Sequence, residues 1–404
     1  MAMVQRKRGG PLQGVRVVEM GKIWAGPETG RHFAFLGAEV IKIESLGSLD
    51  FTRNTSRKGD INKAPGFQSV NPQKLSAQID LKAGKGVELV LDLLRSSDIF
   101  VENLRPGAME RMGLGYEAVK AVNPGIVYVS MGMYGNDGPL SYQTGYAPCF
   151  NAVGGLSALV GYAGRPPTGI NVRYADSTYG TAAAYAGLVA LVHRRKTGVG
   201  QFVDVSACET MTSMIADTVM DYTLNGVVHG CDDNRHAEMA PHGAYPCQGG
   251  DWISIAVSSD AAWGALAAAM GRAELAREPR FRSLADRKAN EAELDRLVAQ
   301  WTAARDVGEL VSELQARGVA AGKSQNSIDL VSDPLFWERG FYPEVTEPDG
   351  HVKSTVGPSW KMTRGAAITD DAPRLGDHTA YVLGDILGLS PDEQQKLADA
   401  GITR

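Results

Sequence analysis

The sequence is poor in cysteine and has no long apolar stretch. Its 404 residues include only four cysteines, which lie far apart without a Cys-x-x-Cys pair. This spacing predicts neither a zinc site nor a disulfide framework, and a reducing cytoplasm is the expected compartment. The longest apolar stretch, residues 180–192, has about 13 residues, too few for a membrane-spanning helix of roughly 20. The basic residues 1–11 precede no apolar segment, so no signal peptide is expected.

An excess of basic residues is also missing. The chain has 41 Lys and Arg against 46 Asp and Glu, a net charge of −5, which does not predict binding to nucleic acid. Its 44% apolar and 22% charged residues are typical of a folded protein rather than a disordered one. The length predicts two or three domains. Composition therefore favours a large soluble α/β enzyme and says nothing about its chemistry.

Several common catalytic motifs are absent or incomplete. Residues 318–324 resemble a phosphate-binding loop, but the first glycine is one residue too close to the second. Residues 113–115 lack the third glycine of a dinucleotide fingerprint and follow a helix rather than a strand. The seven histidines form no i,i+4 pair, and there is no Gly-x-Ser-x-Gly sequence. We therefore expect no metal site and no serine nucleophile of the hydrolase type.

The first half of the chain alternates short β-branched runs with helical patterns. Strands are predicted at residues 15–20, 38–44, 97–102 and 126–130. Helices are predicted from the Gly-Pro turn at residues 26–27 through residue 35, at 87–94 and at 116–122. Strands that alternate with such helices indicate βαβ units and a parallel sheet. The fold class predicted for this half is therefore an α/β domain of Rossmann type.

The second half begins with a helix of small residues at 180–195, which ends in basic residues and glycine, a normal helix stop. A strand at 201–205 follows. The further elements predicted are a strand at 252–257, helices at 261–270, 291–303 and 307–316, a strand at 342–346, and helices at 378–387 and 391–400. We therefore expect a large domain at 1–224, a polar linker at 225–244, a small α+β domain at 245–325, and a linker and C-terminal return to the large domain at 326–404.

One carboxylate, Asp176, lies where the small-residue helix begins. It can cap the helix by accepting hydrogen bonds from the free N–H groups of the first turn. Alternatively, it is a nucleophile held against a helix whose Ala and Gly residues let a bulky ligand approach closely. The local sequence does not decide between these two roles.

A series of short blocks runs through the chain in a fixed order. The blocks are residues 12–19, 25–27, 36–44, 80–82, 98–107, 111–116, 123–124, 134–139, 194 with 197–201, and 375–379. In this order they resemble the family III CoA-transferases. That group contains the crotonobetaine/carnitine, formyl-CoA/oxalate and benzylsuccinate CoA-transferases and the 2-methylacyl-CoA racemases. The resemblance covers residues 11–404.

The resemblance implies an architecture and a reaction. Family members are interlocked, ring-like homodimers or related heterodimers, with the active site between the large domain of one subunit and the small domain of its partner. The family's nucleophile corresponds to Asp176, which forms an acyl anhydride and then an aspartyl-CoA thioester. Acyl-CoA and an organic acid are the substrates, and no permanently bound cofactor is expected. Water must be excluded, because an exposed anhydride would hydrolyse.

The resemblance also implies contacts for CoA. They are Ile23 and Ala25 along the pantetheine, Ile79 and Lys82 near the adenine, Asn103 and Arg111 at the nucleotide, and Tyr134 near the thioester. Gly249 and Gly250 are a candidate oxyanion-binding loop, although a plain β-hairpin turn explains them as well.

Departures from the family pattern narrow the substrate. The racemases have a His-Asp pair where this chain has Tyr146 and Ala147, which disfavours racemization. Formyl-CoA/oxalate enzymes carry a glutamine in place of Trp24, so very small acids are disfavoured. With Tyr146, the residues Trp24 and Met133 are the candidate substrate pocket and suggest a larger or aromatic acid, although core packing explains them equally well. Arg173 is either a partner for a second carboxylate or a solvated loop residue.

The sequence therefore predicts transfer of CoA from a donor such as succinyl-CoA to a medium-sized organic acid, aromatic or dicarboxylic, of the benzylsuccinate kind. A 2-methylacyl-CoA racemase on the same scaffold and one subunit of a heteromeric CoA-transferase are the alternatives.

Overall fold

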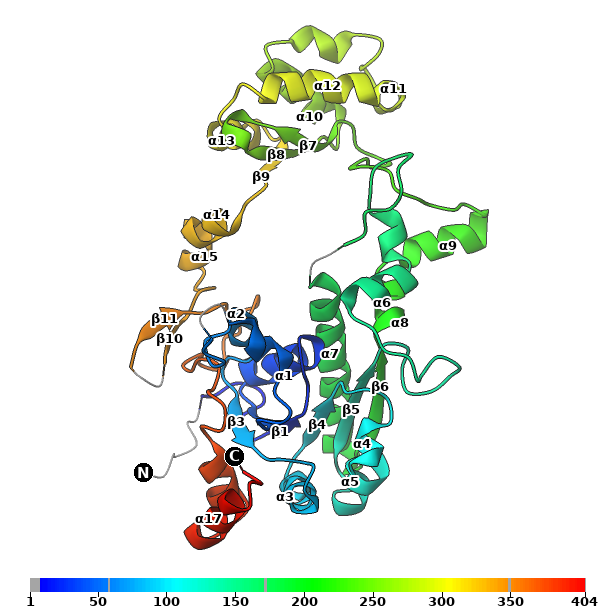
Figure 1. The fold of residues 1–404 in the computed structure, drawn as a ribbon. Coiled ribbons are helices and arrows are strands. Elements are labelled where there is room, and N and C mark those ends of the chain that lie inside the picture. The colour runs from blue at the N-terminus through cyan, green and yellow to red at the C-terminus, as the bar shows by residue number, and fades with distance from the viewer. Residues whose placement is uncertain (1–7, 57–58, 171–172, 348–349, 404) are drawn as a thin grey trace. The chain divides into compact units, whose positions relative to one another are not determined.

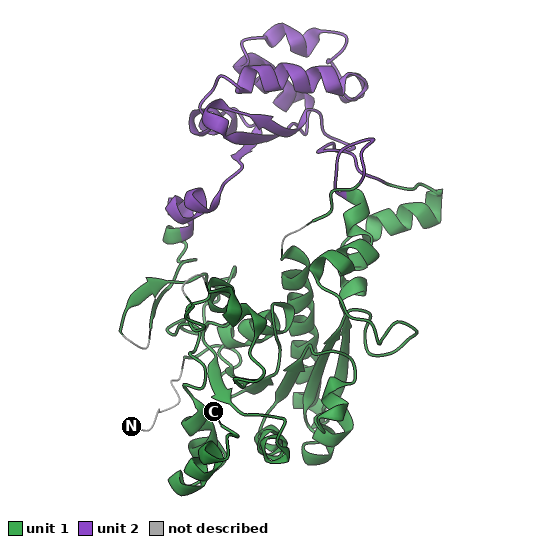
Figure 2. Ribbon diagram, in the orientation of Figure 1, with its two compact units in different colours: residues 1–159, 167–229, 337–404 green, residues 160–166, 230–336 purple. Residues whose placement is uncertain are grey.

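The chain divides into two units (Figure 2). The computed structural model describes residues 8–56, 59–170, 173–347 and 350–403. Unit 1 combines residues 1–159, 167–229 and 337–404, and unit 2 combines residues 160–166 and 230–336. The last segment of the chain thus returns to the unit in which the chain begins.

Unit 1 is built on a six-stranded sheet in which all neighbouring strands are parallel (Figure 1). In spatial order the strands are β3 (Leu75–Gln78), β2 (Glu39–Glu44), β1 (Arg16–Glu19), β4 (Ile99–Glu102), β5 (Val127–Gly132) and β6 (Gln201–Ser206). The order 3-2-1-4-5-6 is that of a doubly wound Rossmann sheet, which confirms the predicted fold class. The strand order reverses between β1 and β4, so the loops that follow these two strands are neighbours.

Helices cover both faces of this sheet. The helices of unit 1 are α1 (Ala25–Phe35), α2 (Pro65–Val70), α3 (Gly84–Arg95), α4 (Ala108–Arg111), α5 (Tyr116–Val122), α6 (Ala147–Val153), α7 (Tyr174–Thr197), α8 (Ala207–Ser213), α9 (Ala216–Asn225), α16 (Thr379–Tyr381) and α17 (Pro391–Asp399). Because side chains alternate along a strand, Val17 joins a buried core with α1 and α7, whereas Val18 joins a core with α3 and α5.

The edge strand β3 has no predicted counterpart, because its sequence Leu-Ser-Ala-Gln lacks a β-branched residue. The C-terminal segment covers its open edge. The His378 N–H donates to the Ser76 carbonyl oxygen at 2.9 Å, and the Gln78 N–H donates to Thr379 Oγ1 at 3.0 Å. The sequence block at residues 375–379 thus protects a sheet edge that would otherwise pair with other chains.

Helix α7 begins six residues earlier than the predicted start at residue 180 and ends as expected at Gly198, whose φ is 77°. Two of its glycines, Gly180 and Gly187, pack closely against α1. A Cβ at Gly180 would lie 2.7 Å from the Ala25 carbonyl oxygen, and one at Gly187 would lie 3.0 Å from the Phe33 ring. The expectation that these small residues leave room for a ligand is therefore wrong for Gly180 and Gly187, since α1 occupies the space.

We predict that Gly180→Ala destabilises the protein by about 1–3 kcal/mol, because the added methyl group clashes with the Ala25 carbonyl oxygen and the Glu28 side chain of α1. Urea unfolding measures the change. Gly264→Ala is the matched control: this helical glycine in unit 2 has open space around its Cβ position, so the exchange should stabilise by about 0.5–1 kcal/mol. Equal unfolding midpoints for Gly180→Ala and the wild type would contradict the close packing.

Unit 2 has a three-stranded antiparallel sheet in the order β7 (His242–Pro246), β8 (Trp252–Ala256), β9 (Ala320–Lys323). Its helices are α10 (Asp260–Ala269), α11 (Leu284–Ala289), α12 (Glu291–Thr302), α13 (Val307–Ala316) and α14 (Ser327–Ser332). Ile253 and Ile255 of β8 enter a core formed with α10, α12 and α13. Residues 318–324, which resemble a phosphate-binding loop, include β9.

The remaining elements are α15 (Pro334–Glu338), at the boundary of the two units, and the antiparallel pair β10 (Glu344–Thr346) and β11 (Val352–Ser354). The four cysteines are free thiols. In the part of the chain that the structure describes, every helix is too short or too polar to cross a lipid bilayer.

Candidate functional site

Asp176 is the third residue of α7, not its cap. The cap position belongs to Arg173, and the helix start has no side-chain cap hydrogen bond. No described residue donates a hydrogen bond to the Asp176 carboxylate or forms an ion pair with it. The capping role left open by the sequence is therefore wrong, and no described residue binds the carboxylate.

The surroundings of Asp176 oppose its ionization. Burial raises the pKa of its carboxyl group to about 6, and the nearby Arg173 guanidinium acts in the opposite direction. A strongly perturbed pKa in a carboxylate without a structural partner is typical of a functional site. At neutral pH the group is mostly ionised, and its raised pKa makes it a stronger base than an exposed aspartate.

Trp24 and Arg173 flank this carboxylate. The Trp24 indole Nε1 donates a hydrogen bond at 3.1 Å to Ser177 Oγ, one residue beyond Asp176. The Arg173 guanidinium carbon lies 4.3 Å from the centre of the Trp24 ring, a cation–π contact. No described residue accepts a hydrogen bond from the Arg173 guanidinium or pairs with its charge. An exposed cation is thus held by stacking close to the candidate nucleophile.

The loop that carries Trp24 follows β1, at the reversal of strand order. It comprises residues 21–24 and is named here the 21–24 loop. Ile23 within it has a φ of 72°, which is rare for a β-branched residue.

A family model matches most of the chain. The model described as CoA-transferase family III aligns with residues 12–379. The chain belongs to this family. It is therefore an enzyme that transfers CoA, with acyl-CoA as a substrate.

Named relatives support this membership. The chain is 36% identical to a succinyl-CoA–D-citramalate CoA-transferase of Chloroflexus aurantiacus over 95% of this chain and 96% of that one. It is 31% identical to the alpha subunit of a succinyl-CoA–L-malate CoA-transferase of Chloroflexus aurantiacus, over 96% and 91% of the two chains. A crystal structure of a CaiB/BaiF family protein from Brucella suis matches with a TM-score of 0.86 at 31% identity, covering 94% of this chain and all of that one.

The residues expected along the pantetheine lie around the 21–24 loop of this CoA-transferase. The Ile23 N–H donates to Asp50 Oδ1 at 3.0 Å, and Ala25, the first residue of α1, is buried. Ile79 and Lys82, expected at the adenine, follow β3. The Ile79 side chain is only 1% exposed, so it packs in the core, whereas Lys82 is exposed and its ammonium lies close to Gly47 after β2.

The residues expected at the nucleotide and thioester follow β4 and β5. Both ends of the Asn103 amide bind the backbone of Lys22: Oδ1 accepts from its N–H at 2.7 Å, and Nδ2 donates to its carbonyl at 3.0 Å. Asn103 thus supports the 21–24 loop. Arg111 on α4 is exposed, and Tyr134 is half-buried against the core of α7. Their roles toward CoA stay predictions.

The expected substrate-pocket residues are spread over both units. Met133 packs closely against Gly145, where a Cβ would lie 2.6 Å from its sulfur, and Tyr146 just before α6 is 66% exposed. Gly249 and Gly250 form a turn between β7 and β8 with φ of 74° and 86°, both favourable only for glycine. Their geometry is that of a hairpin turn, and their role toward an oxyanion stays a prediction.

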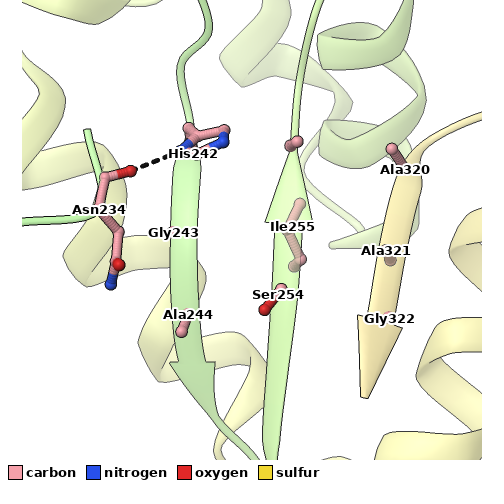
Figure 3. A pocket seen from close by; sticks show the side chains of 10 residues that line it. Asn234, His242, Gly243, Ala244, Ser254, Ile255, Ala320, Ala321 and Gly322 are labelled. Carbon is pink, nitrogen blue, oxygen red and sulfur yellow. Dashed lines mark hydrogen bonds between the residues drawn. The ribbon is translucent and has the colours of Figure 1, made fainter. Parts of the chain in front are cut away.

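Unit 2 contains a pocket of about 380 Å³ on its sheet (Figure 3). Its lining is Asn234, His242, Gly243, Ala244, Ser254, Ile255, Ala256, Ala320, Ala321 and Gly322. His242 Nδ1 donates to the Asn234 carbonyl oxygen at 2.5 Å. This lining contains no carboxylate nucleophile and no lysine or arginine, so the pocket does not match CoA transfer as well as the surroundings of Asp176 do.

Among the described residues, no group of His, Cys, Asp and Glu is arranged to hold a metal ion.

A buried charge network beneath the 21–24 loop was not predicted from the sequence. Glu19, Lys42, Asp50 and Lys74 are all buried; Lys42 Nζ lies 3.0 Å from both Glu19 Oε1 and Asp50 Oδ2, and Lys74 Nζ lies 2.6 Å from Glu19 Oε2. A signal was available, because Lys42 interrupts the apolar strand sequence Val-Ile-Lys-Ile. A lysine at such a position must have buried acidic partners.

Proposed function

We propose that Asp176 carries the CoA transfer, from a donor such as succinyl-CoA to a medium-sized dicarboxylic acid. The observation that supports this proposal is a partly buried carboxylate with no described partner, a raised pKa, and a free guanidinium beside it. Structural carboxylates in helices normally have hydrogen-bond donors, whereas a nucleophile needs a free oxygen.

The reaction proceeds through two covalent intermediates. An Asp176 oxygen attacks the thioester carbonyl of the donor, and the carbon–sulfur bond breaks to give an acyl anhydride and CoA thiolate. The thiolate then attacks the Asp176 carbonyl carbon, which releases the donor acid as its carboxylate and leaves an aspartyl-CoA thioester. The carboxylate of the acceptor attacks this thioester, and the reverse sequence releases the new acyl-CoA and regenerates Asp176. No proton is gained or lost, and no resident cofactor is needed.

Arg173 supports a dicarboxylic acceptor. One carboxylate of the acid must react at Asp176, and a second can pair with the guanidinium, whose planar N–H groups match a carboxylate in a forked geometry. The citramalate and malate enzymes to which this chain is similar are named for dicarboxylic acids. Benzylsuccinate also has two carboxylates, with an aromatic ring in addition.

An acid panel tests the proposed function. The protein is incubated with succinyl-CoA or acetyl-CoA and with pairs of acids of equal length that have one or two carboxylates, benzylsuccinate included. Hydroxylamine or borohydride traps the aspartyl-CoA thioester. Transfer to dicarboxylates with a trapped adduct at Asp176 supports the proposal. Exchange of the α-proton without CoA transfer would instead indicate a racemase, and activity only with a second related chain would indicate a heteromeric enzyme.

We predict that Arg173→Gln raises KM for a dicarboxylic acceptor by about 10- to 100-fold, since a charge-assisted hydrogen bond is lost. It should also shift the acidic limb of the pH–rate profile. In the wild type the rate falls below about pH 6 as Asp176 is protonated. Without Arg173, which lowers the pKa of Asp176, the fall begins at higher pH.

Arg195→Gln is the matched control, because Arg195 is an exposed arginine in the last turn of the same helix. It should change neither KM for the dicarboxylic acceptor nor the pH–rate profile. If Arg173→Gln leaves both the KM ratio of di- to monocarboxylates and the pH profile unchanged, Arg173 does not face the acceptor.

We also propose that the enzyme is a dimer. Three apolar side chains on one face of α7 are exposed in the single chain: Tyr185 at 70%, and Val189 and Val192 at 53% each. This i, i+4, i+7 stripe is typical of a helix face that packs against another surface. Sedimentation equilibrium should find a dimer, and Val189→Glu should yield a monomer with the same circular dichroism spectrum. A monomeric wild type would refute this assembly.

A further inference from the structure

We propose that Asp50 is a positioning residue for the transfer reaction. Together with Lys42 and Asn103 it holds the 21–24 loop so that the Trp24 indole stays bound to Ser177 beside Asp176. This inference rests on the proposed role of Asp176 and adds a fully buried residue outside α7.

Side chains satisfy the backbone of this loop in place of regular structure. Lys42 Nζ donates to the Gly21 carbonyl at 2.6 Å, and Asp50 Oδ1 accepts from the Ile23 N–H at 3.0 Å. Asn103 pairs with both the N–H and the carbonyl of Lys22. The three supporting side chains come from β2, from the segment after β2 and from the end of β4. Buried polar groups with fixed partners hold one geometry, because any displacement leaves a donor or acceptor unpaired.

The held geometry is one that isoleucine does not adopt freely. At a φ of 72° the Ile23 side chain crowds its own backbone, so this conformation persists only where the surroundings impose it. The hydrogen bond from its N–H to Asp50 is a direct restraint on that residue. Local strain maintained by a buried carboxylate suggests that the loop conformation is used, rather than merely tolerated.

Asp50 is itself anchored. It is fully buried, and its Oδ2 lies 3.0 Å from Lys42 Nζ. Its Oδ1 also accepts from Thr52 N at 2.9 Å and from Thr52 Oγ1 at 2.7 Å. Burial alone would raise its pKa, but Lys42 and the Thr52 hydrogen bonds outweigh this effect and lower it. The carboxylate is therefore an ionised, fixed acceptor for the loop.

The residue at the end of this loop touches the reaction site. Trp24 donates to Ser177 at 3.1 Å and stacks against Arg173. Along the chain these two residues lie on either side of Asp176, Arg173 at the cap position of α7 and Ser177 in its first turn. A loop that shifted would turn the indole away from both contacts. Asp50 thus acts on the site through Ile23 and Trp24.

A double-mutant cycle tests this route. Asp50→Asn and Trp24→Phe should each lower kcat by about 10- to 100-fold, as a misplacement of about 1 Å does. If Asp50 acts through Trp24, the double variant loses no more than the more severe single variant. Losses that multiply would overturn the proposal. Ser177→Ala leaves the buried network intact and should reproduce the loss of Trp24→Phe; an unchanged kcat would also overturn it.

A spectroscopic measurement separates positioning from stability. The chain has six tryptophans, so protein labelled with 5-fluorotryptophan should give six ¹⁹F resonances. The resonance that is missing from the spectrum of Trp24→Phe belongs to Trp24. Asp50→Asn should move it. Asp98→Asn is the matched control: Asp98 pairs with Arg194 at 2.5 Å, outside the Trp24 surroundings, so it should lower stability and leave this resonance in place. An unmoved resonance in Asp50→Asn would refute the positioning role.

This measurement does not require turnover. A protein without transfer activity whose Trp24 resonance still moves would overturn the proposed function and retain the support of the loop by Asp50. CoA transfer by the wild type, combined with kcat losses of Asp50→Asn and Trp24→Phe that multiply in the double variant, would support the proposed function and overturn the positioning role of Asp50.

Discussion

Asp176→Asn is expected to abolish CoA transfer and to make the protein more stable. The amide cannot form the anhydride, so kcat should fall by at least about 10⁴-fold, as when other covalent nucleophiles are removed. No adduct should be trapped by hydroxylamine. Loss of activity alone would not distinguish a nucleophile from a structural residue, and the stability measurement does.

The sign of the stability change follows from the pKa. Burial raises the pKa of Asp176 from 3.8 to about 6 in the folded protein, so the folded state holds the proton more tightly than the unfolded state. The contribution of Asp176 to stability therefore falls as pH rises from about 4 to 6, by about 3 kcal/mol. Asparagine does not ionise. Its stability advantage should be complete at pH 8 and absent near pH 3.5.

Urea unfolding at these two pH values measures the difference. Asp217→Asn is the control, because Asp217 also lies in the first turn of a helix, α9, but is exposed. It should change neither activity nor the pH dependence of stability. An Asp176→Asn variant that is less stable than the wild type at pH 8 would show that the carboxylate has a structural role.

Lys42→Met is expected to destabilise the protein by about 3–5 kcal/mol, the largest effect on folding predicted here. Lys42 is buried and lies 3.0 Å from the carboxylates of both Glu19 and Asp50. Its pKa is raised, since the neighbouring carboxylates outweigh the effect of burial. Without the ammonium, two buried carboxylates lose their common partner, and an uncompensated buried charge is strongly destabilising.

The matched control is Lys85→Met on α3. Lys85 pairs with Glu88 at a similar distance, 2.9 Å, but both side chains are more than half exposed. Such a surface pair contributes about 0–1 kcal/mol. Chemical unfolding of the two variants should differ by several kcal/mol, and equal midpoints would contradict a cooperative buried network.

Much of the fold follows from patterns within short stretches of sequence. The strands β1, β2, β4, β5 and β6 are rich in apolar and β-branched residues, which is typical of a parallel sheet. The edge strand β3 was not predicted, because its sequence lacks β-branched residues, and the segment around His378 that bonds to its outer edge lies about 300 residues away. In unit 2, the strands β7 and β9 were not predicted, because their sequences contain glycine and alanine in place of β-branched residues.

Part of the candidate site can likewise be predicted from the sequence, and part cannot. The ordered blocks along the chain single out Asp176 and its family without any coordinates. They predict that Asn103 contacts the nucleotide, and this stays a prediction, but they do not reveal that its amide holds the backbone of Lys22. They do not reveal Asp50 or Lys42, because a buried ion pair becomes evident only when its partners are seen together.

The sequence by itself determined the α/β class and the family, and it predicted Asp176 as the nucleophile. Tertiary structure alone decided that Asp176 is desolvated, that it caps no helix, and that Trp24 and Arg173 flank it. The physical reason is distance along the chain: the Trp24–Ser177 hydrogen bond joins residues 153 positions apart, and burial is a property of everything that packs around a group. Local patterns encode propensity and periodicity, but a pKa and a contact depend on the whole fold.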